Sequence, residues 1–414
     1  MVNLEIYRRD NDPHVATETI PDEFCRLACL TYTDDPPERH AAARELLAAH
    51  PELTEDHIWA AAAAADSDAV RRLLAADREA ANRDGGPYAW KPLHYLTYAR
   101  HDRNLPETDV VVTARLLLAA GADPNAGYLW RDMQTPFTVL TGVFGEGEQG
   151  PGRCPRHPHE DALARLLLDA GADPNDGQAL YNRMFRRGDD HLSILFEHGL
   201  GTGDGGPWKA LLGDAMQSPR ELVDQQLAWA VPRGFTERVR LVLAHGADAT
   251  RPLKDGRTPA EAAAANGDRT MLALLVAAGA DAPALDGLDA FVADCLAGDA
   301  AVVARAGAAD PTLLDRARTA HPGLIARAVD AGRSEAIPLL ASLGFDVNAR
   351  RDGETALHWS AWNGDIAVAR MLLDAGADPD LPDEAFDATP LGWAEHGCQE
   401  DFIAFIRPLT ASAL

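Results

Sequence analysis

The densest group of side chains that could carry out chemistry lies between residues 154 and 161. The sequence there, Cys-Pro-Arg-His-Pro-His-Glu-Asp, brings Cys154, His157 and His159 together with two carboxylates. Thiolate, imidazole and carboxylate groups are ligands that zinc takes in proteins. Their spacing fits no closed zinc module, and the prolines stiffen the segment. We therefore expect a solvated inserted loop without a metal, and a metal-dependent regulator or enzyme around residues 154–161 is the alternative hypothesis.

Two histidines, His94 and His358, are candidates for acid–base chemistry because imidazole titrates near neutral pH. They occupy the fourth position of two similar segments, Lys-Pro-Leu-His at 91–94 and Thr-Ala-Leu-His at 355–358. The sequence contains no G-x-S-x-G, P-loop or H-E-x-x-H motif that would mark a known kind of catalytic site. We predict no enzymatic activity and no cofactor.

The segment 352–380 indicates which elements must position these residues. Thr355 can cap a helix through its hydroxyl group, and a short helix is expected from about residue 356 to 362. Asn363 and Gly364 break it, because both tolerate the left-handed backbone that a chain reversal needs. A second amphipathic helix is expected from about residue 366 to 375, and Gly376 ends it.

This segment resembles an ankyrin repeat, a helix–turn–helix module that begins with T-P-L-H and ends with G-A-D. The beginning recurs at 91–94, 135–137, 258–259 and 389–391, and the ending recurs at 121–123, 171–173, 246–248, 279–281 and 376–378. Ala356 stands where the family has proline. The resemblance covers roughly residues 21–410 and is firm at 91–125, 134–175, 221–283 and 334–393.

The resemblance implies an all-α fold, an α-solenoid of about ten ankyrin helix–turn–helix repeats with finger-like turns. A single repeat cannot bury its own apolar face, so neighbours must stack. We expect residues 1–19 to be a loose N-terminal tail and residues 20–412 to form a single solenoid with degenerate caps. An inserted loop at 143–158 and a spacer at 200–207, both rich in glycine, interrupt it.

The resemblance also implies structural roles for several polar residues. His94 and His358 are expected to form hydrogen bonds between adjacent turns. The aspartates of the G-A-D endings are expected to cap or brace turns: Asp123, Asp173, Asp248, Asp281 and Asp378.

Partner recognition in this family uses the finger-like turns and the short first helices, which line a concave face. Trp, Tyr and Arg are the residue types that dominate binding hot spots. We therefore expect the variable, exposed residues of these positions to bind a partner: Trp90, Tyr128, Trp130, Arg131, Met133, Lys254, Arg257, Arg350, Arg351, Trp362, Asn363 and Phe386. The alternative hypothesis is that the protein is a purely structural spacer and that none of these residues binds a partner.

The composition narrows the class of partner. The formal net charge of the 414 residues is −26, and Lys91, Lys209 and Lys254 are the only lysines. Such a chain is unlikely to hold nucleic acid through phosphate contacts. We predict that the protein binds another protein of unknown identity. An acidic inhibitor or immunity-type protein that masks a basic partner is the alternative.

The sequence also predicts where the protein resides. The five cysteines are scattered and odd in number, which is no disulfide framework and fits a reducing compartment. The first residues lack the apolar core of a signal peptide, and no apolar run approaches the ~20 residues that span a membrane. We expect a cytoplasmic monomer without membrane contact. The bias towards Ala, Arg, Asp, Gly and Pro indicates a GC-rich, bacterial genome.

Overall fold

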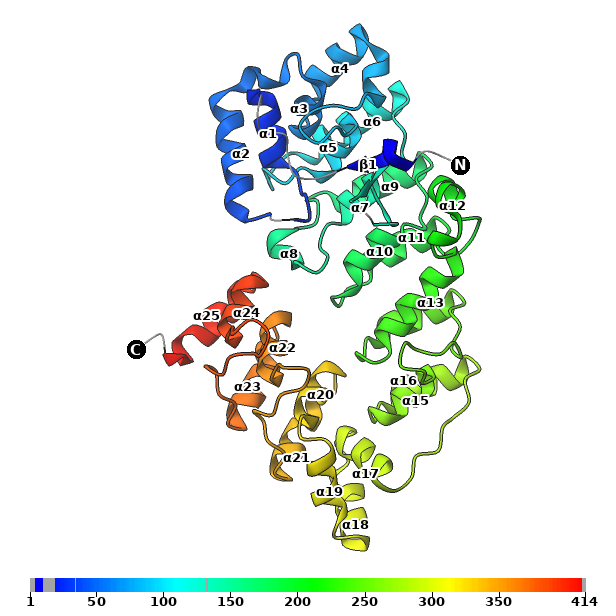
Figure 1. Cartoon of the computed structure of the whole chain (residues 1–414), viewed down its shortest axis with the longest axis vertical. Helices are drawn as coiled ribbons and strands as arrows, with labels where there is room; N and C mark the ends of the chain where they lie inside the picture. The colour runs from blue at the N-terminus through cyan, green and yellow to red at the C-terminus, as the bar shows by residue number, and fades with distance from the viewer. Residues whose placement is uncertain (1–3, 10–18, 34, 132, 412–414) are drawn as a thin grey trace. The chain divides into compact units, whose positions relative to one another are not determined.

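The computed structural model describes residues 4–9, 19–33, 35–131 and 133–411. Helices dominate this part of the chain, and a short three-stranded sheet accompanies them (Figure 1). The chain divides into two compact units, Met1–Leu222 and Val223–Leu414. The division falls within helix α13 (Pro219–Ala230). Whether the units form one continuous solenoid over residues 20–412 stays a prediction.

Unit 1 contains the three strands and four of the six 3₁₀ helices of the described chain. Its elements are η1 (Leu4–Tyr7), β1 (Arg8–Arg9), α1 (Ile20–Ala28), α2 (Pro37–Ala49), η3 (Pro51–Thr54), α3 (Ile58–Ala63), α4 (Ser67–Ala76), η4 (Arg78–Asn82), α5 (Pro92–Tyr98), α6 (Glu107–Ala120), β2 (Gly127–Trp130), β3 (Pro136–Thr138), α7 (Val139–Phe144), α8 (Gly150–Arg153), α9 (Glu160–Asp169), α10 (Gly177–Met184), α11 (Asp190–Glu197), α12 (Gly206–Leu212) and η5 (Gly213–Ala215).

Unit 2 consists of short helices joined by turns. Its elements are α14 (Thr236–Ala244), α15 (Pro259–Ala265), α16 (Arg269–Ala277), α17 (Gly287–Leu296), α18 (Ala300–Ala309), α19 (Leu313–Ala320), α20 (Leu324–Asp330), η6 (Ser334–Ala336), α21 (Ile337–Ser342), α22 (Ala356–Asn363), α23 (Ile366–Asp374), α24 (Pro390–His396), α25 (Glu400–Ile406) and η7 (Arg407–Leu409).

The helix pair predicted at 352–380 is confirmed as α22 and α23. The backbone N–H of Thr355 donates to Nδ1 of His358 at 3.2 Å, which closes the first turn of α22. Nε2 of His358 lies 3.0 Å from the carbonyl oxygen of Ala388 in the next turn of the chain. His358 is therefore a brace between adjacent turns, as the resemblance implied. Gly364 and Gly376 end the two helices with φ of 69° and 94°.

The glycines of the predicted repeat endings all adopt positive φ, a conformation that glycine reaches more readily than any other residue. Their φ values lie between 78° and 103°: Gly121, Gly171, Gly199, Gly246, Gly279, Gly344 and Gly376. This agreement confirms the predicted stops of the second helices.

The aspartates of these endings close their turns by accepting a backbone N–H two residues further on. The N···O distances are 2.8–3.0 Å for Asp123, Asp173, Asp248 and Asp378. Asp281 is exposed, and its bracing role stays a prediction.

Asparagines connect successive turns. Oδ1 of Asn125 accepts the N–H of Asp173 at 2.8 Å, while its Nδ2 donates to the carbonyl oxygen of Gly171 at 2.8 Å. Asn348 makes the same two bonds to Asp378 and Gly376, at 2.8 and 3.2 Å. A single side chain thus satisfies two backbone groups of the next turn, which fixes the spacing between neighbouring turns.

The structure differs from two predictions, the loose N-terminal tail and the helix that was expected to open at residues 135–137. Residues 4–9 are not loose, because β1 pairs in parallel with β2, with Arg8 opposite Leu129. The segment 135–137 does not open a helix, because Pro136–Thr138 form β3, antiparallel to β2. The helix starts three residues later, where the hydroxyl of Thr138 accepts the N–H groups of Leu140 and Thr141. The rest of the predicted tail, apart from residue 19, lies outside the described residues.

The inserted loop at 143–158 is packed rather than solvated. Cys154 and His157 are buried, and the N–H of His157 donates to the carbonyl oxygen of Val143 at 3.0 Å. The buried guanidinium of Arg100 donates to the carbonyl oxygens of Pro155 at 2.7 Å and Gly142 at 2.5 Å. The loop therefore belongs to the core of unit 1. The spacer at 200–207 leads into α12. There the ring of Trp208 packs against Gly127 at the start of β2, and its Nε1 donates to the carbonyl oxygen of Asn125 at 2.9 Å.

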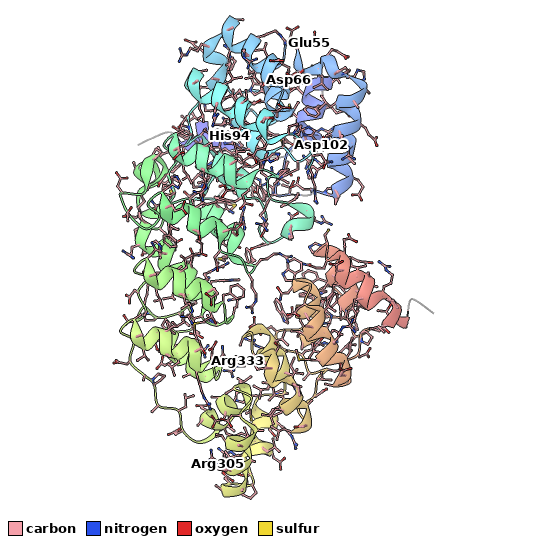
Figure 2. All side chains as sticks on the ribbon, turned by 180° about the vertical axis from the view of Figure 1, so that it is seen from behind. Glu55, Asp66, His94, Asp102, Arg305 and Arg333 are labelled. Carbon is pink, nitrogen blue, oxygen red and sulfur yellow. The ribbon has the colours of Figure 1, made fainter. Side chains whose placement is uncertain are left out.

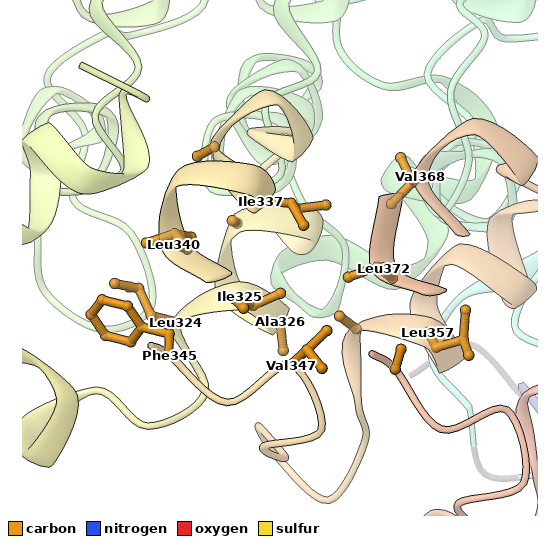
Figure 3. Packing of buried hydrophobic residues seen from close by; sticks show 14 of the residues in the cluster. Leu324, Ile325, Ala326, Ile337, Leu340, Phe345, Val347, Leu357, Val368 and Leu372 are labelled. Atoms are coloured by element: carbon orange, nitrogen blue, oxygen red, sulfur yellow. The ribbon is translucent and has the colours of Figure 1, made fainter. Parts of the chain in front are cut away.

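A cluster of buried apolar side chains, contributed by the segment from α17 to α25, forms a core of unit 2. Figure 3 shows its centre, where side chains from α20, α21, α22 and α23 meet, among them Leu324, Leu340, Leu357 and Leu372. Helices of neighbouring repeats pack on one another in this cluster, α20 on α22 and α22 on α24, so these repeats share one apolar core.

Candidate partner-binding surface

Two of the residues predicted to be exposed on turns, Trp90 and Tyr128, are buried. Each is 2% exposed, and their rings stack at a centroid distance of 5.1 Å with planes 19° apart. Tyr128 also stacks on Phe137 at 5.6 Å. The fingers of unit 1 fold back onto their own helices, where large aromatic surfaces gain most from leaving water. The expectation that these two side chains face solvent is therefore wrong.

The tip of the β2–β3 finger keeps its predicted residues nearer to solvent. Trp130 is half-buried, and the guanidinium of Arg131 lies 5.4 Å from its ring centroid. Met133 is 38% exposed. Residue 9 lies against this tip, because the N–H of Arg131 donates to the carbonyl oxygen of Arg9 at 3.2 Å. The N-terminal segment thus covers part of the surface that we expected to bind a partner.

The turn before α15 presents Lys254 and Arg257. The N–H of Leu253 donates to the carbonyl oxygen of Arg257 at 2.8 Å, which closes the turn with both side chains exposed. Arg257 forms an ion pair with Asp255 at 2.6 Å. Lys254 forms no ion pair with the residues that the structure describes.

The turn before α22 presents Arg350 and Arg351, which point to different neighbours. Arg350 donates to the carbonyl oxygen of Pro382 at 2.7 Å and lies 3.6 Å from a carboxylate oxygen of Glu384. Arg351 forms an ion pair with Asp330 of α20 at 2.7 Å. Both side chains are half-buried and held in place.

Trp362, Asn363 and Phe386 lie on the last repeats of unit 2. The ring of Trp362 stacks on His396 at 5.8 Å, and Nδ2 of the exposed Asn363 donates to the carbonyl oxygen of Trp359 at 2.9 Å. Phe386 is 78% exposed. Oδ1 of Asp383 fixes its turn by accepting the N–H of Phe386 at 2.6 Å.

A pocket of about 440 Å³ in unit 2 brings three of the predicted residues together. Arg257, Arg350 and Arg351 come from two turns 93 positions apart, so sequence spacing gave no reason to group them. The pocket is lined by Pro232, Arg257, Asn266, His321, Pro322, Gly323, Leu324, Arg327, Asp330, Ala331, Arg350 and Arg351.

Arg327 is the central pocket residue that the sequence analysis missed. It lies on α20, outside the segments where the resemblance is firm, and no motif indicated which way it would point. Its Nε donates to Oδ1 of Asn266 at 3.1 Å, and its Nη2 donates to the carbonyl oxygen of Ala265 at 2.8 Å. These bonds join α20 to the end of α15.

The segment 154–161 does not assemble metal ligands. Sγ of Cys154 lies 3.6 Å from Oδ2 of Asp35, whereas Nδ1 of His157 accepts the N–H of His159. Burial raises the pKa of the Cys154 thiol well above its usual value and lowers that of His157. Among the described residues, no group of three or more His, Cys, Asp or Glu side chains is placed to hold a metal ion.

Comparison with known proteins identifies part of unit 2. A family model described as ankyrin repeats (3 copies) matches residues 302–383. This segment therefore consists of ankyrin repeats. The helix pair α22–α23 lies within it, so the resemblance is confirmed there; for the other segments it stays a prediction.

Two plant proteins illustrate the similarity. A protein named "Potassium channel AKT1" from Oryza sativa subsp. indica is 37% identical over 86 residues, which is 20% of this chain and 9% of its own length. "Zinc finger CCCH domain-containing protein 50" from Oryza sativa subsp. japonica is 46% identical over 65 residues, 14% of this chain and 10% of its own. The chain thus spans about a tenth of these relatives. They are plant proteins, so the bacterial source stays a prediction.

None of the helices in the described part of the chain combines the length and the apolar character that crossing a bilayer requires.

Proposed function

We propose that this protein is a protein–protein interaction module that recognises its partner with the turns of unit 2 and has no catalytic activity. The observation that carries the proposal is the match of residues 302–383 to ankyrin repeats, which are in general modules of protein–protein interaction. We further propose that the protein is a cytoplasmic monomer that binds neither nucleic acid nor membranes.

Three side chains of the last repeats that are wholly or partly exposed support this proposal. Phe386 places its ring in solvent on a turn whose backbone Asp383 holds, and Trp362 and Asn363 lie on α22. The backbone of the Phe386 turn and the ring of Trp362, which stacks on His396, are already ordered, so less conformational entropy is lost on binding. Trp362, Asn363 and Phe386 are therefore the contact residues we propose first.

Replacing Trp362, Asn363 and Phe386 together with alanine is expected to abolish capture of the natural partner. The experiment is affinity capture from the cytosol of the source organism with quantitative mass spectrometry, comparing the triple variant with the unaltered protein. Val276→Ala is the control and should capture the same partner, because Val276 is 39% exposed on α16 and is not among the predicted contact residues. If the triple variant captured the same proteins in the same amounts, these residues would make no contact and a structural spacer would be favoured.

The net charge of −26 supports a second candidate, an inhibitor that masks a basic partner. Affinity capture at low and at high salt distinguishes this inhibitor from the interaction module proposed first, since an interaction driven by surface charge weakens as the salt concentration rises. A captured partner that is neutral or acidic, or that stays bound at high salt, removes this candidate.

A further inference from the structure

The pocket in unit 2 has a charge opposite to that of the whole chain. Four arginines line it, and Asp330 is the one carboxylate among the lining residues. Arg233 lies next to it, following Pro232 of the lining, with its guanidinium 3.4 Å from the ring centroid of Trp229. A concentration of arginine in one concave site is unexpected in a protein with a net charge of −26.

The arginines of this pocket are unequally neutralised. Arg257, Arg350 and Arg351 each lie within 4 Å of a carboxylate oxygen, those of Asp255, Glu384 and Asp330. The ion pairs of the described residues include none from Arg327 or Arg233. Arg327 is bonded to neutral acceptors instead, the amide oxygen of Asn266 and the carbonyl oxygen of Ala265.

The surroundings of Arg327 are electrostatically positive. Burial is the main cause that lowers its pKa to about 10, and the charges of Arg351 and Arg257 lower it further, against a smaller opposing effect of Asp289. The pKa of His321, another lining residue, is lowered by burial and by the charge of Arg327. An anion in this pocket would offset the repulsion between these like charges.

We propose that the pocket binds carboxylate side chains of an acidic segment in the partner protein. This inference rests on the proposed function, because it specifies what the interaction module recognises. The planar guanidinium group offers N–H donors in a fork that matches a carboxylate. The fixed positions of Arg327 and Arg350 mean that little side-chain entropy is lost when the anion binds.

The acidic surface of the remaining chain defines the kind of ligand. A uniformly acidic protein would be repelled by a chain of net charge −26, so the ligand is a short acidic segment rather than a broad acidic surface. The exposed Lys254, on the same turn as Arg257, extends the positive surface beyond the pocket for such a segment. The size of the pocket, about 440 Å³, is within the range of small ligand sites.

Fluorescence anisotropy with a fluorescein-labelled hexaglutamate peptide tests the inference on the full-length protein. The peptide is expected to bind saturably, and Arg327→Gln and Arg350→Gln are each expected to weaken binding about tenfold, since each removes hydrogen bonds to a charged ligand. Arg305→Gln is the matched control. Arg305 is exposed on α18, outside the pocket lining, and Figure 2 labels it.

Circular dichroism and thermal unfolding establish that each variant is folded. Arg350→Gln provides a second test in case the loss of the Asn266 bonds unfolds the Arg327 variant. Equal affinity in all variants, or a labelled hexalysine peptide binding in place of hexaglutamate, would overturn the inference. Stabilisation of the protein by inorganic phosphate in thermal unfolding, with no binding of the peptide, would do the same. If the peptide failed to bind while the Trp362 triple variant still lost its partner, only this inference would fail, and the proposed function would stand.

Discussion

Unit 1 is expected to lose stability steeply as the pH falls below about 6.5, because it buries several histidines in their neutral form. Burial is the largest cause that lowers the pKa of His40 and His94 to about 3 and that of His101 to about 4, from an ordinary value of 6.5. The positive charges of Arg39 and Arg100 lower the pKa of His40 further. His94, labelled in Figure 2, lies among the rings of Trp90, Tyr98 and Tyr128.

The direction of the pH effect on stability depends on whether the folded or the unfolded state binds more protons. Below pH 6.5 the unfolded chain protonates these histidines while the folded unit does not, so their contribution is fully present above 6.5 and is lost on acidification. Well below pH 6.5 each histidine lowers the free energy of unfolding by about 1.4 kcal/mol per pH unit, so the three together lower it by about 5 kcal/mol between pH 6.5 and 5. The raised pKa values of buried Glu160 and Asp176 oppose part of this loss.

Urea unfolding at pH 7.5 and pH 5, followed by hydrogen exchange of the α5 amides, measures the effect in unit 1. His101→Phe should reduce the pH dependence, because His101 packs edge-on against Phe24 at 5.1 Å and neither ring nitrogen has a hydrogen-bond partner in the described structure. The control is His50→Gln, at a side chain that is 40% exposed and lies 3.1 Å from Glu52, and it should change the pH dependence far less. A transition midpoint that stayed constant from pH 7.5 to 5 would show that these histidines are not buried as described.

Replacing Trp90 with alanine is expected to lower the free energy of unfolding of unit 1 by about 3–5 kcal/mol. Its ring contacts Tyr88 at 4.5 Å, Tyr98 at 5.1 Å and Tyr128 at 5.1 Å, and alanine would leave a cavity among them. Trp90→Phe should cost less, because it keeps the aromatic contact and removes an indole N–H that has no hydrogen-bond partner in the described structure. Urea unfolding gives both values.

Phe386→Ala is the matched comparison, an aromatic truncation at a side chain that is 78% exposed. It should change the stability of unit 2 by no more than about 0.5 kcal/mol. The opposite pattern, a stable Trp90 variant and an unstable Phe386 variant, would mean that the two side chains exchange the roles of core and surface.

The helix bounds of 352–380 could be predicted because local chemistry decides them. The cap at Thr355, the left-handed glycines Gly364 and Gly376 and the apolar face of α23 act within a few residues of one another, so their spacing in the sequence carries the structure. The same holds for the repeat endings with Asp123 and Asp173.

The binding surface was less predictable because burial depends on distant segments. Trp90 follows the same kind of turn in the sequence as Phe386, but a neighbouring finger supplies Tyr128 to cover it. The pairing of β1 with β2 also left no local signal, since it joins residues about 120 positions apart. Arg327 became a pocket residue only through contacts with the end of α15, 61 positions earlier in the chain.

Hydrogen–deuterium exchange of the full-length protein, with and without its captured partner, tests most directly whether the turns of unit 2 recognise that partner. We predict slower exchange on binding in the three turns at 253–257, 350–354 and 383–388, with α16 and α23 unchanged. Protection confined to unit 1, or none in these three turns, would contradict the account.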